Sequence, residues 1–367
     1  MINVTKPFLP PIEEYIQNLQ GIWDRCHLTN YGPLLIELEE KLKQYLGVKH
    51  LFVVNNGTIA LQMAIKGLDL KGEILTTPFS YVATTASIVW EGCEPVFVDI
   101  DPETFCMDPQ RIEAAITPHT TAILATHVYG NACDVEAIEK IAKKHNLKVI
   151  YDAAHAFGVQ LDGQSILNFG DVSTLSFHAT KLFHTVEGGA LITNDDVLAE
   201  KLSYMCNFGH DGPENFVGLG TNAKLSEFHA AMGLCLLPKV ADIIAHREKI
   251  TRLYDELLKA LQIKRPSMDS RLTYNYAYYP VLLPSEDDVV ELRNGMNAAD
   301  IFPRRYFYPS LSELVYVKKQ SVPITKDISS RMLCLPLSHE LTEEDVQKVV
   351  CLIQKHFQHA NAIVDSN

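Results

Sequence analysis

Long apolar runs, paired cysteines and an excess of positive charge are all missing from this 367-residue sequence. No run approaches the 18 apolar residues typical of a membrane-spanning helix, and the start, MINVTKPFLPPIEEY, lacks the apolar core of a signal peptide. The net charge of −13 argues against a surface for nucleic acid or anionic membranes. We therefore expect a cytoplasmic protein with no nucleic-acid or membrane partner.

Cysteine and histidine spacing excludes the common metal motifs. The eight cysteines form no C-x-x-C pair, and several lie in apolar runs such as GLCLL and RMLCLPL, which indicates buried free thiols of a reduced compartment. Four central histidines match neither H-x-x-x-H nor H-E-x-x-H, so we expect no metal site; they are His127, His155, His178 and His184.

Short apolar segments alternate with helix-like stretches through the first half of the chain. The stretches between the segments include TIALQMAIKGL, YVATTASIVWEG and DVEAIEKIAKKHN. This alternation predicts an α/β fold with a mainly parallel sheet covered by helices on both faces. Two further strands, STLSF and GALIT, are expected to close one edge of a seven-stranded sheet. The other five predicted strands are residues 51–56, 73–78, 95–100, 122–128 and 148–154.

The length predicts two domains, since a domain holds about 100–200 residues. GPLLIELEEKLKQYLG is predicted to be a helix that ends at Gly47, and a long helical pattern begins near residue 224. We expect a large domain over residues 1–249 and a smaller α+β domain over 250–367. The glycine-rich loop 209–222 has few apolar anchors, so it is predicted to be mobile or ordered by a ligand.

Polar residues follow two of the predicted strands. In VVNNGTIALQMA a strand leads to a helix that begins at Gly57 and Thr58, where free backbone N–H groups suit a phosphate, although local turn chemistry also explains such a sequence. In KVIYDAAHAFG, Asp152 ends an apolar strand. It either caps the next turn or holds a cationic ring nitrogen, which burial would strengthen.

A single lysine lies among small and hydroxylated residues in STLSFHATKLFHTVEGGALITN. Lys181 is either an ordinary loop lysine in solvent or an amine whose chemistry requires shelter. Together with a phosphate grip and Asp152, it supplies the parts that hold pyridoxal 5′-phosphate: an amine for the Schiff base and a carboxylate for the ring nitrogen. Ser176 and Thr180 flank it, and Tyr81 offers either a stacking surface or core filling.

Four blocks in the same order resemble the nucleotide-sugar aminotransferases of the DegT/DnrJ/StrS type. The similarity runs from about residue 29 to the helix near 260, with a looser match in SSRMLCLPLSHELTEEDVQKVV. The resemblance implies a fold-type-I scaffold, pyridoxal phosphate, and a homodimer with sites at the subunit interface. The blocks are YGPLLIELEEKLKQYLGVKHLFVVNNGTIALQMA, PFSYVATTASIVWEGCEPVFVDIDPETFCMD, THVYGNACDVEAIEKIAKKHNLKVIYDAAHAFG and GDVSTLSFHATKLFHTVEGGALITND.

The resemblance also implies a role for each matched residue. Lys181 is the Schiff-base lysine, and Asp152 pairs with the pyridinium nitrogen. His155 stands where the family often has glutamine, near the phenolic oxygen. Where the family often has an arginine, this chain has Ala223-Lys224, which leaves a bidentate anion contact there open. The remaining matches are Gly57, Thr58 and Ser176 at the phosphate, Tyr81 on the ring face, and Asn222 at the phosphate of the partner subunit's cofactor.

The family mostly aminates keto sugars on a nucleoside diphosphate, with L-glutamate as the usual donor. The motif SFHATK…EGG is closer to that of enzymes that aminate C4 than to that of enzymes that aminate C3. The resemblance therefore favours conversion of dTDP-4-keto-6-deoxyglucose to dTDP-4-amino-4,6-dideoxyglucose. The product would serve O-antigen lipopolysaccharide or another glycan. A C3 aminotransferase and a non-catalytic regulatory or binding protein are the alternatives. Arg304 and Arg305, in IFPRRYFYP, either contact a diphosphate or base or form a solvated pair.

Overall fold

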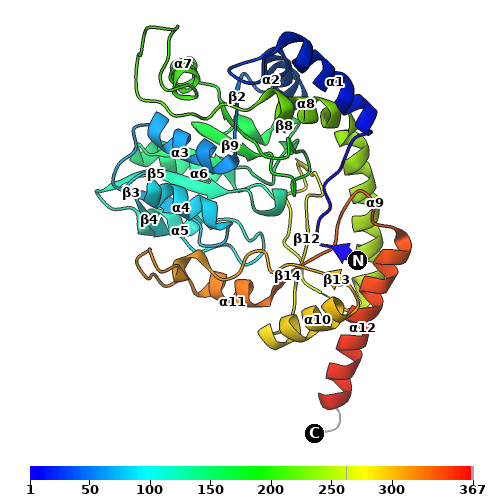
Figure 1. Ribbon diagram of the computed structural model, residues 1–367. Coiled ribbons are helices and arrows are strands. Elements are labelled where there is room, and N and C mark those ends of the chain that lie inside the picture. Colours follow the sequence, from blue (N-terminus) through cyan, green and yellow to red (C-terminus); the bar gives the residue numbers. More distant parts are fainter. Residues whose placement is uncertain (262, 365–367) are drawn as a thin grey trace.

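The structure, a computed structural model, describes residues 1–261 and 263–364 and is built around one seven-stranded sheet (Figure 1). The strand order is β2-β10-β9-β6-β5-β3-β4, and only β10 runs against its two neighbours. All seven predicted strands form this sheet, so the predicted α/β class is confirmed. The strands are β2 (His50–Val54), β3 (Glu73–Thr76), β4 (Glu94–Phe97), β5 (Thr120–Thr126), β6 (Lys148–Asp152), β9 (Val172–Ser176) and β10 (Gly189–Thr193).

Helices cover both faces of the sheet. Consecutive strand residues point to opposite faces, so Ile74 and Ile150 belong to one apolar cluster while Leu75 and Tyr151 belong to the other. One face packs against α3 (Gly57–Gly67), α4 (Val82–Trp90) and α7 (Asp196–Met205). The other packs against α2 (Pro33–Leu46), α5 (Pro109–Ala115), α6 (Val135–His145) and α8 (Glu227–Leu236), with α1 (Ile12–Arg25) against α8.

The expectation that the last two strands close an edge of the sheet is wrong. β10 pairs with β2 from Gly189 opposite Val54 to Thr193 opposite His50, and β9 pairs along its other side. All five residues of β10 are buried, as an interior strand requires. The edges are therefore β2 and β4, because the return strand inserts beside the first strand of the sheet.

Local signals explain where the helices near the site begin and end. Pro33 begins α2 with a φ already suited to a helix, and Gly47 ends it in the left-handed conformation at φ +64°, as predicted. At α3 the Asn56 side chain accepts a hydrogen bond from the Ile59 N–H at 2.8 Å. This cap leaves the first amide groups of α3 pointing towards the carboxyl ends of the strands.

A third apolar cluster, called the smaller cluster below, forms outside the seven-stranded sheet around an antiparallel pair, β12 (Tyr279–Leu282) and β14 (Met332–Leu335). Helix α9 (Val240–Leu258) connects the smaller cluster to the sheet cluster that contains Leu75 and Tyr151, since Ile250 packs in the former and Ile243 in the latter. We propose that the boundary between domains 1–249 and 250–367 lies within α9. Strand β1 (Ile2–Asn3) nevertheless pairs with β13 (Ile301–Phe302), so the first residues join the smaller cluster. The other elements are α10 (Glu286–Ala298), α11 (Pro323–Arg331), α12 (Glu343–Val364), and a small sheet of β7 (Gln160–Leu161), β8 (Gln164–Ser165) and β11 (Leu272–Thr273).

Among the described residues, one helical stretch, Glu227–Leu261, is long and apolar enough to cross a membrane. Of its most apolar window, 56% is buried inside the protein, where α8 packs against α1 and α2. The stretch thus has the burial expected of a core helix.

Candidate active site

A cavity of about 350 Å³ lies at the carboxyl ends of the central strands, beside the starts of α3 and α4. This is the edge at which open α/β sheets bind their ligands. Seven of the eight predicted site residues line it, although they come from four separate segments of the chain: Gly57, Thr58, Tyr81, Asp152, His155, Ser176 and Lys181.

The turn from β2 into α3 forms one end of the cavity. A Cβ atom added to Gly57 would lie 2.9 Å from the Cβ of Ser176, so the backbone approaches the end of β9 more closely than a side chain allows. The amides of Gly57 and Thr58 belong to the first helical turn and have no acceptor within the helix. With the Ser176 hydroxyl they form a set of donors suited to a phosphate.

Asp152 ends β6 at the floor of the cavity and is buried. Its carboxylate accepts hydrogen bonds from the Thr84 hydroxyl at 2.7 Å and from the Ala154 N–H at 3.1 Å. Burial raises the pKa of this carboxyl, and those two hydrogen bonds and Lys181 oppose the rise. A cation bound beside Asp152 would favour its ionised form.

A chain of hydroxyl groups leads to Asp152 from β5. Thr126 donates to Ser80 at 3.1 Å, and Ser80 shares a 2.7 Å hydrogen bond with Thr84. Sequence reasoning missed Thr84, although the spacing of Ser80 and Thr84 by four residues at a helix start could have indicated neighbouring hydroxyls. The hydrogen bond from the Thr84 hydroxyl fixes the orientation of the Asp152 carboxylate.

Lys181 lies just beyond β9, and its amine is sheltered within the cavity. Burial lowers the pKa of the amine to about 8, while Asp152 and Tyr81 oppose that change. Its backbone N–H donates to the His178 carbonyl at 2.8 Å. Of the two interpretations of the sequence, the structure supports the sheltered amine, and more of it is uncharged near neutral pH than of an ordinary lysine.

His155 is a neutral hydrogen-bond donor towards the cavity. The Tyr129 N–H donates to His155 Nδ1 at 3.2 Å, which leaves the proton on Nε2. Burial, assisted by Lys181, lowers the pKa of the ring well below its usual range. A neutral imidazole with Nε2–H suits an anionic oxygen within the cavity.

Aromatic rings from residues 278–307 close one side of the cavity. Phe307 stacks on His155 with ring centres 5.6 Å apart, and Tyr278 and Tyr306 line the same wall. Tyr81, at the start of α4, is 59% exposed and free to contact a flat ligand. The sequence placed aromatic residues in YFYP but held no signal that this segment reaches the sheet.

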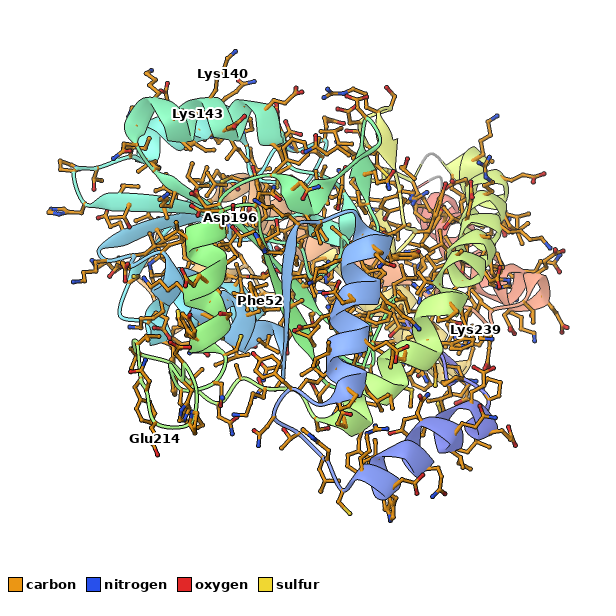
Figure 2. All side chains as sticks on the ribbon, turned by 90° about the horizontal axis from the view of Figure 1, so that it is seen from above. Phe52, Lys140, Lys143, Asp196, Glu214 and Lys239 are labelled. Carbon is orange, nitrogen blue, oxygen red and sulfur yellow. The ribbon has the colours of Figure 1, made fainter. Side chains whose placement is uncertain are left out.

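Asn222 does not line the cavity of its own chain. It is exposed near the end of a loop whose far end, at Glu214, projects away from the sheet (Figure 2). The Lys224 amine donates to Asn222 Oδ1 at 2.7 Å and to Asn207 at 2.9 Å. The predicted arrangement, in which Asn222 serves a neighbouring subunit, stays a prediction.

Among the described residues no three His, Cys, Asp or Glu side chains are grouped closely enough to hold a metal ion. The cavity instead combines an amine, a buried carboxylate and free backbone amides. This set of groups fits an aromatic phosphate ligand that has a carbonyl and a cationic ring nitrogen.

Comparison with known proteins agrees with this chemistry. The chain is 45% identical over 363 residues to dTDP-4-amino-4,6-dideoxy-D-glucose transaminase of Shigella dysenteriae, which covers 96% of this chain and 98% of the relative. An Escherichia coli protein of the same name is 40% identical over 365 residues, with the same coverage. The crystal structure of DesI with its TDP-sugar product superimposes with a TM-score of 0.93 at 31% identity and covers 100% of this chain and 95% of DesI.

These comparisons confirm both the resemblance seen in the sequence and the fold-type-I scaffold. The family match extends over residues 11–354 and includes every residue of the cavity. The chain therefore belongs to the DegT/DnrJ/EryC1/StrS aminotransferase family.

Proposed function

We propose that this aminotransferase moves the amino group of L-glutamate to C4 of dTDP-4-keto-6-deoxy-D-glucose, forming dTDP-4-amino-4,6-dideoxy-D-glucose. The main observation behind this proposal is the 45% identity, over nearly the whole of both chains, to a transaminase named for that sugar. The cavity supports it, because Lys181 and Asp152 lie within it as transamination requires.

Enzymes of this family depend on pyridoxal 5′-phosphate, and the residues present fit it. When bound, the cofactor supplies an electron sink that makes the carbon bearing the substrate's amino group acidic. The absence of a Cβ at Gly57 allows the backbone to approach a phosphate. The proposed contacts are Lys181 with the aldehyde, Asp152 with the ring nitrogen, Gly57, Thr58 and Ser176 with the phosphate, Tyr81 with the ring face, and His155 Nε2 with the phenolic oxygen.

Lys181 would have a second role, as a proton carrier, whenever its amine is free. With a pKa of about 8, Nζ can accept a proton from the substrate carbon and later return one. Asp152 and Tyr81 line the same cavity and both affect the pKa of this amine. Phe307 and Tyr278, both buried, exclude water from that side of the cavity.

A homodimer with its sites at the subunit interface is part of the proposal. The loop before Asn222 exposes four apolar side chains, an arrangement that favours burial against another chain. Asn222 would then reach the cofactor phosphate of the partner subunit. The four residues are Phe208, Phe216, Val217 and Leu219.

We further propose a cytoplasmic location and a role in supplying an amino sugar for O-antigen lipopolysaccharide or another glycan. The nucleotide-linked substrate supports both, since activated sugars are assembled into glycans after such modification.

The experiment that tests the function is NMR of the product after incubation with pyridoxal phosphate, glutamate and dTDP-4-keto-6-deoxyglucose. We expect an equatorial amine at C4. Lys181→Ala, which lacks the amine, is the matched control and should give no product. The visible absorbance band of the bound cofactor should change when glutamate is added to the wild type.

Two results would redirect the proposal. Protein that responds to glutamate but leaves the 4-keto sugar unchanged would move the substrate to 3-keto or differently linked sugars. Protein that binds nucleotide sugar but never responds to any amino donor would instead favour the non-catalytic alternative.

A further inference from the structure

A second hollow, of about 830 Å³, adjoins the active-site cavity. The two share Thr180 and Tyr306 in their walls. Thr180 directly precedes Lys181, so the hollow reaches the segment that carries the reactive lysine. The lining of the hollow includes Arg293, from α10, and Arg304 and Arg305, which follow β13.

In the described part of the structure, the side chains of Arg293 and Arg304 differ from those of the other eight arginines because they form neither an ion pair nor a hydrogen bond. Seven of the ten arginines form ion pairs: Arg25, Arg111, Arg252, Arg265, Arg271, Arg305 and Arg331. An eighth, Arg247, is buried and donates to the Ala277 carbonyl. Within the part of the chain that the structure describes, neither Arg293 nor Arg304 forms an ion pair, and the Nε of Arg293 is buried with no acceptor.

The adjacent Arg305 shows the contrast. Its guanidinium donates to Glu286 at 2.7 Å and to the Ser330 carbonyl at 2.8 Å, and it lies over the Tyr308 ring at 3.4 Å. Arg305 therefore ties α10 to the end of α11. Arg304 and Arg305 are neighbours in sequence but have different surroundings. Arg305 holds two helices together, and Arg304 is free to bind a ligand.

Tyr306 lines both the hollow with Arg293 and Arg304 and the active-site cavity. Burial raises the pKa of its hydroxyl to about 12, Arg304 opposes that rise, and Tyr81 adds to it. Arg304 and the proposed stacking residue, Tyr81, both lie near enough to Tyr306 to change the pKa of its hydroxyl. The hollow and the cavity are neighbouring parts of one continuous surface.

The active-site cavity lacks the cations that a nucleotide sugar needs. No arginine lines it in the described structure, and Lys181 is its one lysine. A molecule with a net charge of −13 repels a diphosphate unless local cations receive it. Arginine suits this task because its planar guanidinium binds phosphate oxygens in pairs.

We propose that Arg293 and Arg304 bind the diphosphate of the nucleotide sugar in this hollow, so that the hexose passes Thr180 and Tyr306 to reach Lys181. The assignment rests on the proposed function and adds a binding site to it.

The test is calorimetric titration of the holoenzyme with dTDP, comparing wild type with Arg304→Gln and Arg293→Gln. Each variant should raise Kd by about tenfold or more, since hydrogen bonds between charged groups are worth ~1.5–3 kcal/mol. Arg304→Lys should recover part of the loss. Arg252→Gln, which removes an exposed arginine of α9 paired with Glu248, is the matched control and should bind dTDP as the wild type does.

The rate of the absorbance change with glutamate should be the same in wild type and both hollow variants. Unaltered dTDP affinity in Arg304→Gln and Arg293→Gln would overturn the site while leaving the proposed function intact. A slower response to glutamate with unaltered dTDP affinity would assign the hollow to the donor's carboxylates, which also overturns it. A wild type that responds to glutamate but binds neither dTDP, UDP nor pyrophosphate would reject both the site and the nucleotide-sugar function.

Discussion

At the scale of single residues, folding shifts Lys181 towards its uncharged form, which is the form that reacts as an amine. Its pKa is about 8 instead of 10.5, because burial penalises the ammonium form. In cofactor-free protein we expect trinitrophenylation of Lys181, followed by peptide mass analysis, to show a midpoint near pH 8. Asp152→Asn should lower that midpoint, since the carboxylate favours the ammonium. A midpoint near 10 in the wild type would contradict the sheltered amine.

The same pKa has a consequence for stability. Between pH 8 and 10.5 the unfolded chain holds more protons at Lys181 than the folded chain does, so this residue's contribution to the free energy of unfolding increases as pH rises. Urea unfolding of cofactor-free wild type and Lys181→Met, at pH 8 and 9.5, should show the difference. The wild type should gain stability relative to the variant at the higher pH, and a loss would reverse the assigned sign.

The contact between Thr84 and Asp152 gives a graded prediction. Asp152→Asn removes the buried charge that is proposed to pair with the ring nitrogen of the cofactor. Losing one partner of a buried ion pair costs ~3–5 kcal/mol, so kcat/KM should fall by at least about a hundredfold. Thr84→Val removes one hydrogen bond to a charged group, ~1.5–3 kcal/mol, and should cost about tenfold.

Thr85 supplies the matched control for that series. It is the next residue of α4, is equally buried, and its hydroxyl has no hydrogen-bond partner. Thr85→Val should therefore keep full activity and fold at least as stably. Equal losses of activity in Thr84→Val and Thr85→Val would show that the effect comes from packing in α4 and not from the carboxylate.

At the scale of elements, two substitutions in the turn between β2 and α3 should affect ligand binding and helix stability separately. Gly57→Ala places a methyl group against Ser176, an overpacking worth ~1–3 kcal/mol that should weaken pyridoxal phosphate binding by about tenfold. Asn56→Ala removes the helix cap and should lower the free energy of unfolding by about 1 kcal/mol. Fluorescence titration and urea unfolding measure the two effects.

Gly295 controls for the addition of a methyl group to a helix. It lies within α10, and nothing is within 4 Å of a Cβ built there. Gly295→Ala should leave cofactor affinity unchanged and stabilise the fold by ~0.5–1 kcal/mol. If Gly57→Ala binds the cofactor as tightly as Gly295→Ala does, the close approach at Ser176 has no part in phosphate binding.

At the scale of the whole molecule, complementation tests the shared site. If Asn222 serves the partner's cofactor, Lys181→Ala and Asn222→Ala are each impaired alone, yet their heterodimer contains one site with both native residues. After random subunit exchange the mixture should regain about a quarter of wild-type activity, since two-fold symmetry places one such site in each heterodimer. No gain on mixing, or full activity from a monomer in light scattering, would exclude the interface role.

The sequence by itself determined the elements and the two central groups of the site. Each strand is a local apolar run, and the ends of α2 and α3 depend on Gly47 and Asn56, which act on their own backbone neighbourhood. Asp152 and Lys181 could be paired in advance because both follow strands, and parallel strands present their carboxyl ends at one edge.

Only the tertiary structure decided which distant residues meet. The place of β10 between β2 and β9 depends on pairing across more than a hundred residues, which no local pattern encodes. The same is true of the Tyr129 N–H that sets the tautomer of His155. Arg304 and Arg305 are neighbours in sequence, yet Glu286 pairs with only one of them. Periodicity and capping are local, whereas burial, charge pairing and proton positions depend on what the rest of the chain brings alongside.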